Sequence, residues 1–293
     1  MTLLDQLIAP AIKSPTIVIP AQAGISSRAG GDCKKIPASA GMTAVCLFSR
    51  QMSIGMLLIL MKGVKMILPH IVRLGLTHVY LLPGTSGYLM IDAGPRGTAP
   101  SFIRSLQRYG ISSGQIRLIL VTHVHFDHVG SLHAIQKQCG CPVLVHQAEA
   151  ELLSQGCVVL PPGTHRLTRW LLRLANRHPR LARRLFRFDP VTPDRVITGP
   201  LDLTPLEFDA RVLPTPGHTP GSLTVITASG QAFVGDLAVN YLPGGRGPYW
   251  PPFGDSRQLI RDSWQILRNQ GATTIYPAHG QPFKAEKLPL FCR

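Results

Sequence analysis

The segment 122–130, with the sequence Thr-His-Val-His-Phe-Asp-His-Val-Gly, constrains the possible fold more than any other part of the chain. It holds three histidines and one carboxylate within six positions, directly after an apolar run at 116–121 that is typical of a buried strand. Gly130 and a helical pattern of apolar residues follow. We therefore expect a ligand cluster on the loop between a buried strand and a helix, which is a rigid and solvent-accessible support for metal chemistry.

The spacing within this segment predicts two metal positions. Side chains at i and i+2 of an extended segment share a face, so His123 and His125 can bind one ion. Where the chain then curls into a helix, Asp127 and His128 point in another direction and can bind a second ion. Imidazole and carboxylate ligands suit zinc, and iron or manganese also bind such sets. The alternatives are a histidine-rich surface loop and a set of hydrogen-bonded core histidines, neither of which binds a metal.

Three further candidate ligands come later in the chain and argue against a plain surface loop. His218 lies in a tight loop at 215–222 that contains two glycines and two prolines. Asp236 and His279 each follow an apolar strand pattern. The seven candidate metal ligands are therefore His123, His125, Asp127, His128, His218, Asp236 and His279. Seven ligands exceed the needs of one tetrahedral ion and suit two ions with a carboxylate between them.

Asp92 ends a predicted hairpin, in which strands at 78–82 and 88–91 flank a turn that contains Pro83 and Gly84. Its carboxylate has two interpretations that the local sequence leaves open. It can cap the turn that precedes Gly94. It can instead accept a hydrogen bond from a metal-ligating histidine and so orient that ring.

The remaining patterns alternate between strands and helices. Further strands are expected at 116–121, 142–145, 206–213, 222–227, 231–234 and 273–276. Helices are expected at 98–109, after Gly130, at 148–154 and at 255–270, the last with Asp255 as its N-cap.

Residues 1–65 differ in character from the rest of the chain. The sequence at 19–25 recurs in similar form at 36–42, and both copies are rich in Pro, Ala and Gly without helical or strand periodicity. A repeat fold needs at least about three units to bury a core. The pattern is similar to a translated palindromic intergenic repeat. We expect 1–65 to be a non-native or disordered extension, with the native start at Met66, Met61 or Met56 and one domain at 66–293.

The net charge of +15 invites a nucleic-acid interpretation, which its distribution weakens. Eight arginines lie between Thr164 and Phe188 with leucines on another face, so this segment predicts a basic amphipathic helix that is kinked at Pro179. The helix belongs to an insertion at about 161–200. Our favoured interpretation is a solvated lid that packs its leucines on the core. The alternatives are a receptor for an anionic substrate, for a phosphate backbone or for an acidic membrane.

The six cysteines show neither a C-x-x-C pair nor the spacing of a disulfide framework. This usage favours free thiols in a reducing compartment, so we expect a cytoplasmic protein. No run of eighteen apolar residues occurs, and no transmembrane helix is predicted. The sequence carries no firm evidence for a nucleic-acid or membrane partner and leaves the oligomeric state undetermined.

These motifs together resemble those of the metallo-β-lactamase fold superfamily of metal-dependent hydrolases. The matching segments are 122–130, Asp92-Ala93-Gly94, 217–222, Gly235-Asp236 and Ala278-His279-Gly280, which occur in the family order over nearly all of 66–293. The resemblance implies an α/β fold, a four-layer αββα sandwich of two mixed sheets flanked by helices.

The same resemblance implies a role for each ligand. It assigns one metal to His123, His125 and His218, the other metal to Asp127, His128 and His279, a bridging position to Asp236 and a supporting position to Asp92. This ligand set is similar to the glyoxalase II and acyl-homoserine lactonase branch and unlike that of the penicillin-destroying enzymes.

The expected activity is hydrolysis of an ester-type bond (thioester, lactone or carboxylic ester) in a small-molecule substrate of anionic or amphiphilic character. Two zinc ions would hold a bridging hydroxide that attacks the carbonyl carbon. Asp127 and Asp92 are the candidate catalytic residues, with Asp127 as the carrier of a proton to the leaving group. The alternatives are a phosphodiesterase that acts on a nucleotide, nucleic acid or phospholipid, and a non-enzymatic metal-binding protein.

Overall fold

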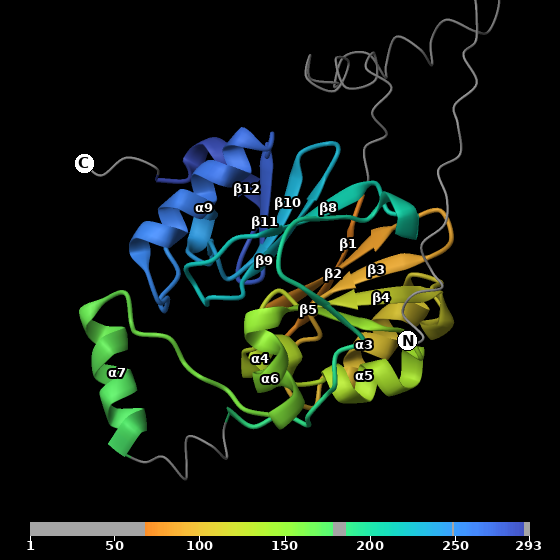
Figure 1. Ribbon diagram of the computed structural model, residues 1–293, viewed down its shortest axis with the longest axis horizontal. Coiled ribbons are helices and arrows are strands. Elements are labelled where there is room, and N and C mark those ends of the chain that lie inside the picture. Colours follow the sequence, from red (N-terminus) through yellow and green to blue (C-terminus); the bar gives the residue numbers. More distant parts are fainter. Residues whose placement is uncertain (1–67, 178–185, 248, 290–293) are drawn as a thin grey trace, which may run out of the picture. The chain divides into compact units, whose positions relative to one another are not determined.

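A computed structural model describes residues 68–177, 186–247 and 249–289, and these residues form two β-sheets that pack face to face (Figure 1). The strands of the first sheet, in spatial order, are β1 (His70–Leu74), β2 (Thr77–Pro83), β3 (Tyr88–Ile91), β4 (Ile116–Leu120), β5 (Val143–His146) and β6 (Arg195–Ile197). The strands of the second sheet, in spatial order, are β12 (Phe283–Lys284), β11 (Thr274–Pro277), β10 (Gln231–Gly235), β9 (Leu223–Thr227), β8 (Ala210–Pro214) and β7 (Leu201–Asp202).

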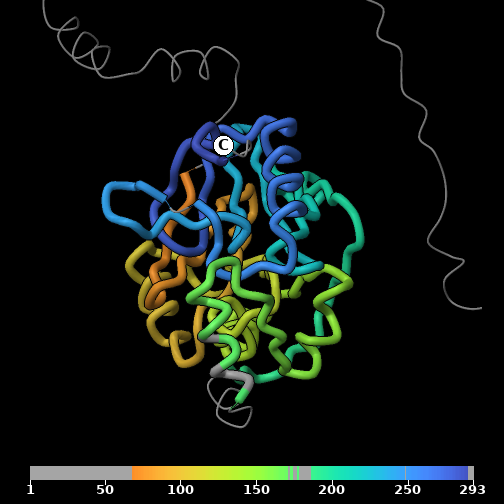
Figure 2. Tube along the Cα trace, turned by 90° about the vertical axis from the view of Figure 1, so that its left-hand side faces the viewer, coloured from red at the N-terminus to blue at the C-terminus, as the bar shows by residue number. Residues whose placement is uncertain are grey.

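Helices cover the outer face of each sheet, as Figures 1 and 2 show from two directions. The first sheet packs against α3 (Ala99–Arg108), α5 (Leu132–Cys139) and α6 (Gln147–Gln155), and the second packs against α9 (Arg257–Asn269). Both sheets mix parallel and antiparallel pairs. The predicted αββα sandwich of two mixed sheets is therefore confirmed.

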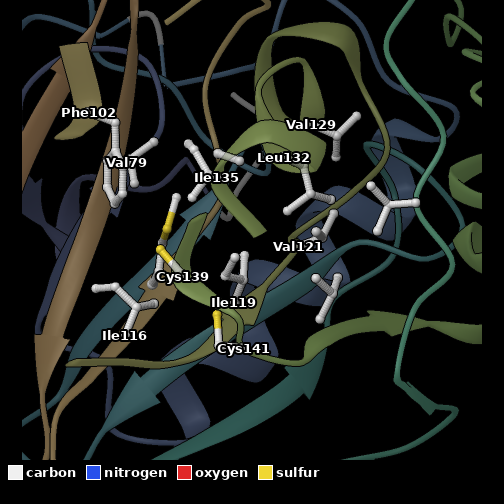
Figure 3. Packing of buried hydrophobic residues seen from close by; sticks show 14 of the residues in the cluster. Val79, Phe102, Ile116, Ile119, Val121, Val129, Leu132, Ile135, Cys139 and Cys141 are labelled. Atoms are coloured by element: carbon white, nitrogen blue, oxygen red, sulfur yellow. The ribbon is translucent and has the colours of Figure 1, made fainter. Parts of the chain in front are cut away.

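Three apolar layers hold the sandwich together. Figure 3 shows the outer layer of the first sheet, where Phe102 of α3 and Ile135 of α5 pack with Ile119 of β4. The middle layer joins the two sheets and includes Leu82 of β2 and Phe233 of β10, both fully buried. The third layer lies under α9. Burial of such side chains stabilises the fold by about 1.5–3 kcal/mol each, which is why strand residues are apolar on both faces.

The parallel pairs decide where the polar loops emerge. β3 pairs with β4, and β10 pairs with β11, each in parallel, so the carboxyl ends of each pair lie side by side. Two backbone hydrogen bonds then join the sheets at these ends: Leu223 N donates to Thr122 O at 2.8 Å, and His78 N donates to Ala278 O at 2.8 Å. The loops that follow four different strands are thereby held at one edge of the sandwich.

The structure corrects some of the predicted boundaries. The strand expected at 206–213 begins only at Ala210, because Leu206 belongs to a short 3-10 turn. Helix α9 begins after Ser256, whose hydroxyl accepts a hydrogen bond from Leu259 N, so the N-cap is Ser256 rather than Asp255. The edge strands β1, β6, β7 and β12 were not predicted, since short edge strands show little periodicity.

The predicted basic helix is present in part. Helix α7 spans Arg166–Arg177, and the continuation through Pro179 lies outside the described residues. The expectation that its leucines pack on the core is wrong for Leu167, which is 66% exposed.

Other expectations concern parts of the chain that the structure leaves undescribed. The proposed extension at 1–65 and the start of the domain at 66 lie outside the described residues.

Among the described cysteines, Cys139, Cys141 and Cys157 are free thiols. None of the helices in the described part of the chain has the length and hydropathy needed to span a membrane.

Candidate metal centre

The structure brings all seven predicted ligands together at the edge where the two sheets meet. The loop after β4 first extends and then turns into the short helix α4 (Phe126–Val129). His125 is the extended residue before this helix, and Asp127 and His128 lie within its single turn. This change from extended to helical backbone separates the segment into two pairs of ligands, as the spacing predicted.

The first group of ligand atoms comes from three loops. His123 Nε2, His125 Nδ1 and His218 Nε2 lie 3.0–3.2 Å from one another, and Asp236 Oδ2 lies 3.7 Å from His218 Nε2. Four ligands at zinc bond lengths of about 2.0–2.1 Å around a tetrahedral ion stand about 3.3 Å apart. The three histidine nitrogens lie close to this separation, and Asp236 Oδ2 lies somewhat farther from His218 Nε2.

The second group comprises Asp127, His128 and His279, and it also contacts Asp236. His279 Nε2 lies 3.1 Å from Asp127 Oδ2 and 3.3 Å from Asp236 Oδ1. His128 Nε2 lies 3.3 Å from the same Asp236 Oδ1. The two oxygens of Asp236 therefore face different groups, which is the position that the sequence resemblance assigned to a bridging carboxylate.

Hydrogen bonds on the far side of four of the rings fix which nitrogen carries a proton. Nδ1 of His218 donates to Phe253 O at 2.9 Å, and Nδ1 of His279 donates to Leu76 O at 3.0 Å. Nδ1 of His128 donates to Asp92 Oδ2 at 2.9 Å. The hydroxyl of Thr122 donates to Asp92 and so accepts from Nδ1 of His123 at 3.0 Å. When these four rings are neutral, the Nε2 atom of each carries no proton, and its lone pair points into the cluster.

Such an arrangement fits a metal ion and little else. The Nε2 lone pairs of His123 and His218 face each other at 3.2 Å with no proton between them. Among the buried atoms without a hydrogen-bond partner in the described residues are His128 Nε2 and Asp236 Oδ1, which both belong to the cluster. Converging lone pairs and carboxylate oxygens repel one another unless a positive charge lies between them, so the donor set fits divalent cations.

The pKa values of the histidines in the metal-free chain also indicate a site for positive charge. Burial, followed by the neighbouring histidines, holds the pKa of His123 well below its usual range and lowers the pKa of His125 to about 3. Burial also lowers the pKa of His279, but Asp236 and Asp127 outweigh it and raise that pKa to about 10. Without metal, the first group therefore excludes protons, while the second attracts them to balance its carboxylates.

Asp92 is fully buried. Of the two roles that the sequence left open, a turn cap or a residue that orients a histidine ring, its contacts fit the second. Its backbone has a φ of 63°, which is uncommon for a residue other than glycine. Its Oδ1 accepts from Thr122 N at 2.8 Å, while Oδ2 accepts from His128. Asp92 thus orients one candidate ligand directly and a second, His123, through the hydroxyl of Thr122.

Sequence reasoning missed Glu149, a residue of α6 that is only 1% exposed. Its Oε2 accepts from Val124 N at 2.9 Å, and its Oε1 accepts from Gly221 N at 3.1 Å. One buried carboxylate thereby joins the loop of His123 and His125 to the loop of His218. Nothing in the local sequence distinguishes Glu149 from a surface glutamate such as Glu151.

A cavity of about 1020 Å³ opens onto the ligands and is lined by five of them. Its other walls are mainly apolar and include Phe126, Leu160, Pro161, Phe186, Leu242 and Phe253. Arg73, an exposed residue of β1, is the single Lys or Arg among the described residues that line it. The cavity can hold a molecule with a large apolar part and one anionic group.

We predict that Glu149→Gln weakens the site, because the amide accepts only one of the two backbone hydrogen bonds and sets an N–H group against the other. The free energy of unfolding of the metal-free chain falls by about 1–3 kcal/mol, and zinc affinity falls about tenfold to a hundredfold. Urea unfolding and chelator competition measure both. Glu151→Gln, two residues later and exposed, is the matched control. Equal stability and zinc affinity in the two variants would contradict the role given to Glu149.

We also predict that the stability of the chelator-treated protein peaks near pH 6.5, the usual pKa of an unperturbed histidine. The pKa values of His123, His125 and His218 are lower in the folded chain than in the unfolded chain. As pH falls below 6.5, the unfolded chain therefore binds more protons than the folded chain, and the folded chain loses stability. The raised pKa of His279 means that its contribution, present below 6.5, is lost as pH rises through about 10.

The melting temperature, measured from pH 4 to pH 10.5 in the presence of a chelator, tests this prediction. His279→Gln should reduce the decline on the alkaline side and leave the acid side unchanged, since only the alkaline loss depends on His279. A melting temperature that rises steadily from pH 6.5 to pH 10 would contradict the prediction.

Comparison with known proteins agrees with the fold and the site. A probable metallo-hydrolase of Methanocaldococcus jannaschii is 29% identical over 207 residues, which cover 69% of this chain and 86% of that protein. The acyl-coenzyme A thioesterase MBLAC2 of Homo sapiens is 26% identical over 233 residues, or 72% of this chain and 75% of that protein. Among solved structures, a metallo-beta-lactamase superfamily protein of Sulfolobus tokodaii is 22% identical with a TM-score of 0.52, covering 74% and 82% of the two chains.

The family assignment rests on a match that spans the whole candidate site. The family model of the metallo-beta-lactamase superfamily matches residues 72–279, a range that begins in β1 and ends at the last candidate ligand, His279. With the two mixed sheets, the flanking helices and the clustered ligands, this match shows that the chain belongs to the metallo-beta-lactamase superfamily and is a metal-dependent hydrolase.

Proposed function

We propose that this protein is a dinuclear hydrolase that cleaves an ester-type bond, and that its site holds two divalent ions, zinc in the first instance. His123, His125 and His218 bind one ion, Asp127, His128 and His279 bind the other, and Asp236 binds both. The observation that carries the proposal is the division of seven donors into two groups that share Asp236. Bound there, the ions would supply a nucleophilic hydroxide near neutral pH and polarise the carbonyl oxygen of the substrate.

The residues of the chain itself then position the substrate and move the proton. Asp127 is 21% exposed and lines the cavity, so its carboxylate contacts both the ligand cluster and a bound substrate. Burial raises the pKa of Asp127, but His128 and His279 outweigh it and hold that pKa below its usual value. Asp127 therefore starts as a carboxylate that accepts a proton from the attacking water and passes it to the leaving group. Asp92 contributes by orienting the ring of His128.

The cavity supports an acyl substrate of amphiphilic character. Apolar walls formed by side chains such as Phe126, Phe186 and Leu242 suit an acyl chain, and Arg73 suits an anionic group at one end of the molecule. The similarity to an acyl-coenzyme A thioesterase supports a thioester as the first substrate to test. Lactones and carboxylic esters present the same carbonyl chemistry and stay within the proposal.

The test of this function is a hydrolysis panel with the metal-loaded and the chelator-treated protein. The panel contains an acyl-coenzyme A thioester, a glutathione thioester, an acyl-homoserine lactone, an aryl ester and an aryl phosphodiester. We expect metal-dependent turnover of carbonyl substrates, with kcat/KM rising from short to medium acyl chains because each added CH₂ group buried contributes about 0.8 kcal/mol. Preferential turnover of the phosphodiester would overturn the proposal in favour of phosphodiester hydrolysis. Absence of all turnover with metal bound would favour a binding protein.

Asp127→Asn tests the proposed proton transfer. Loss of a proton carrier lowers kcat by about 10²–10⁴-fold, and the loss should be largest for alkyl esters, whose alkoxide leaving groups need a proton. An aryl ester with an acidic phenol as leaving group should lose far less. Metal content of the variant is measured in parallel, and Asp262→Asn, an exposed change on α9, serves as the control. An equal loss for alkyl and aryl esters, with metal content unchanged, would contradict this role.

A further inference from the structure

Helix α7 lies in a segment of the chain that leaves the wall of the cavity and later returns to it. Leu160 and Pro161, just before it, and Phe186, after it, all line the cavity. The chain just before α7 is joined to two other lining residues, because Gly163 forms a β-bridge with Phe253 and Thr164 N donates to Pro252 O at 2.9 Å. In Figure 1 the helix itself stands apart from both sheets. The helix therefore follows a segment that lines the cavity without forming part of the sandwich.

The described side chains of α7 combine exposed cations with exposed large apolar groups. The exposed arginines are Arg166, Arg169, Arg173 and Arg177. Their spacing of three or four residues places them in one stripe along the helix. Beside this stripe, Leu167 is 66% exposed and Trp170 is 57% exposed. Residues three positions apart are neighbours on a helix, so Leu167 and Trp170 form one small exposed apolar patch next to the arginines.

The charge of the surrounding segment has a single sign. No aspartate or glutamate occurs between Leu152 and Phe188, a stretch that contains eight arginines. Since no acidic residue of the segment neutralises these arginines, their field attracts anions over a distance of about 10 Å at 0.1 M salt. The positive charge of this segment is therefore complementary to an anionic surface.

We propose that α7 docks the protein on an anionic lipid surface, with its arginines at the headgroup phosphates and with Leu167 and Trp170 among the upper acyl chains. Twelve residues of helix extend about 18 Å, which is too short to cross a bilayer and suits a helix that lies in the interface. Trp is a residue that favours this interface. A nucleic acid would bind the arginines but would leave the apolar side chains of Leu167 and Trp170 in water. A lipid surface explains both the arginines and the exposed apolar side chains.

The test uses the full-length, metal-loaded chain and vesicles in a sedimentation assay. Vesicles of phosphatidylcholine alone are compared with vesicles that also contain phosphatidylglycerol. We expect binding to the anionic vesicles at least about tenfold stronger than to the neutral ones, since each arginine near an anionic surface contributes roughly fivefold in affinity. The fluorescence of Trp170 should shift to shorter wavelength on binding. Trp170→Phe should abolish that shift, because Trp264 is fully buried and Trp250 is half-buried under Arg257.

Two double variants separate the two kinds of contact, each with a matched control. Arg169→Glu with Arg173→Glu should weaken binding by at least about tenfold, while Arg104→Glu with Arg268→Glu, the same charge change on exposed positions of α3 and α9, should leave most of it. Leu167→Gln with Trp170→Gln should also weaken binding. Its control is Leu259→Gln with Ile266→Gln, because these α9 residues are 44% and 40% exposed.

Circular dichroism confirms that the variants keep their helix content. Equal vesicle binding by the α7 variants and their controls would overturn the proposal. So would tight binding of an RNA or DNA duplex that depends on Arg169 and Arg173, together with no binding to anionic vesicles. Neither result involves hydrolysis, so the outcome is independent of the proposed activity.

Discussion

The structure of the site depends on hydrogen bonds that turn the Nε2 atoms of four histidine rings into the two ligand groups. His218 and His279 donate to backbone carbonyls, His128 donates to Asp92, and His123 donates to the hydroxyl of Thr122. In its neutral form each ring turns an unprotonated Nε2 toward the cluster, where Asp236 adds two oxygens, and without metal the second group takes up protons to balance its carboxylates. This concentration of electron pairs is unfavourable in a buried place unless cations occupy it, so the folded chain favours metal binding at this point.

The sandwich satisfies this geometry because the strand ends that carry the ligands are adjacent. Parallel pairing sets Asp92 beside the loop after β4 and Asp236 beside the loop after β11. Hydrogen bonds between backbone groups of the two sheets then hold these edges together. Glu149 adds a connection between two ligand loops that no strand provides. The ligands thus sit on loops, but each loop is fixed at both ends by buried structure, which is what a precise metal site requires.

Sequence patterns predicted the elements that bury a full apolar face and missed those whose form depends on distant contacts. The run at 116–121 and the hairpin before Asp92 were placed correctly because their periodicity is strong. The candidate ligands in segment 122–130 were identified because their spacing is local, and the structure brings them together with His218, Asp236 and His279. Glu149 contacts Gly221, which the fold brings near, and no local pattern marks it. Thr122 begins the 122–130 motif, but its hydrogen bond to Asp92 depends on the fold. The exposure of Leu167 likewise followed no rule of amphipathic packing.

The central claim is that two ions share Asp236 at this edge of the sandwich. The most direct measurement is a crystal structure of the zinc-loaded protein with anomalous diffraction recorded above and below the zinc absorption edge. The account predicts two anomalous peaks, one among His123, His125 and His218 and one among Asp127, His128 and His279, with Asp236 in contact with both. A single peak, or peaks that Asp236 does not contact, would contradict it.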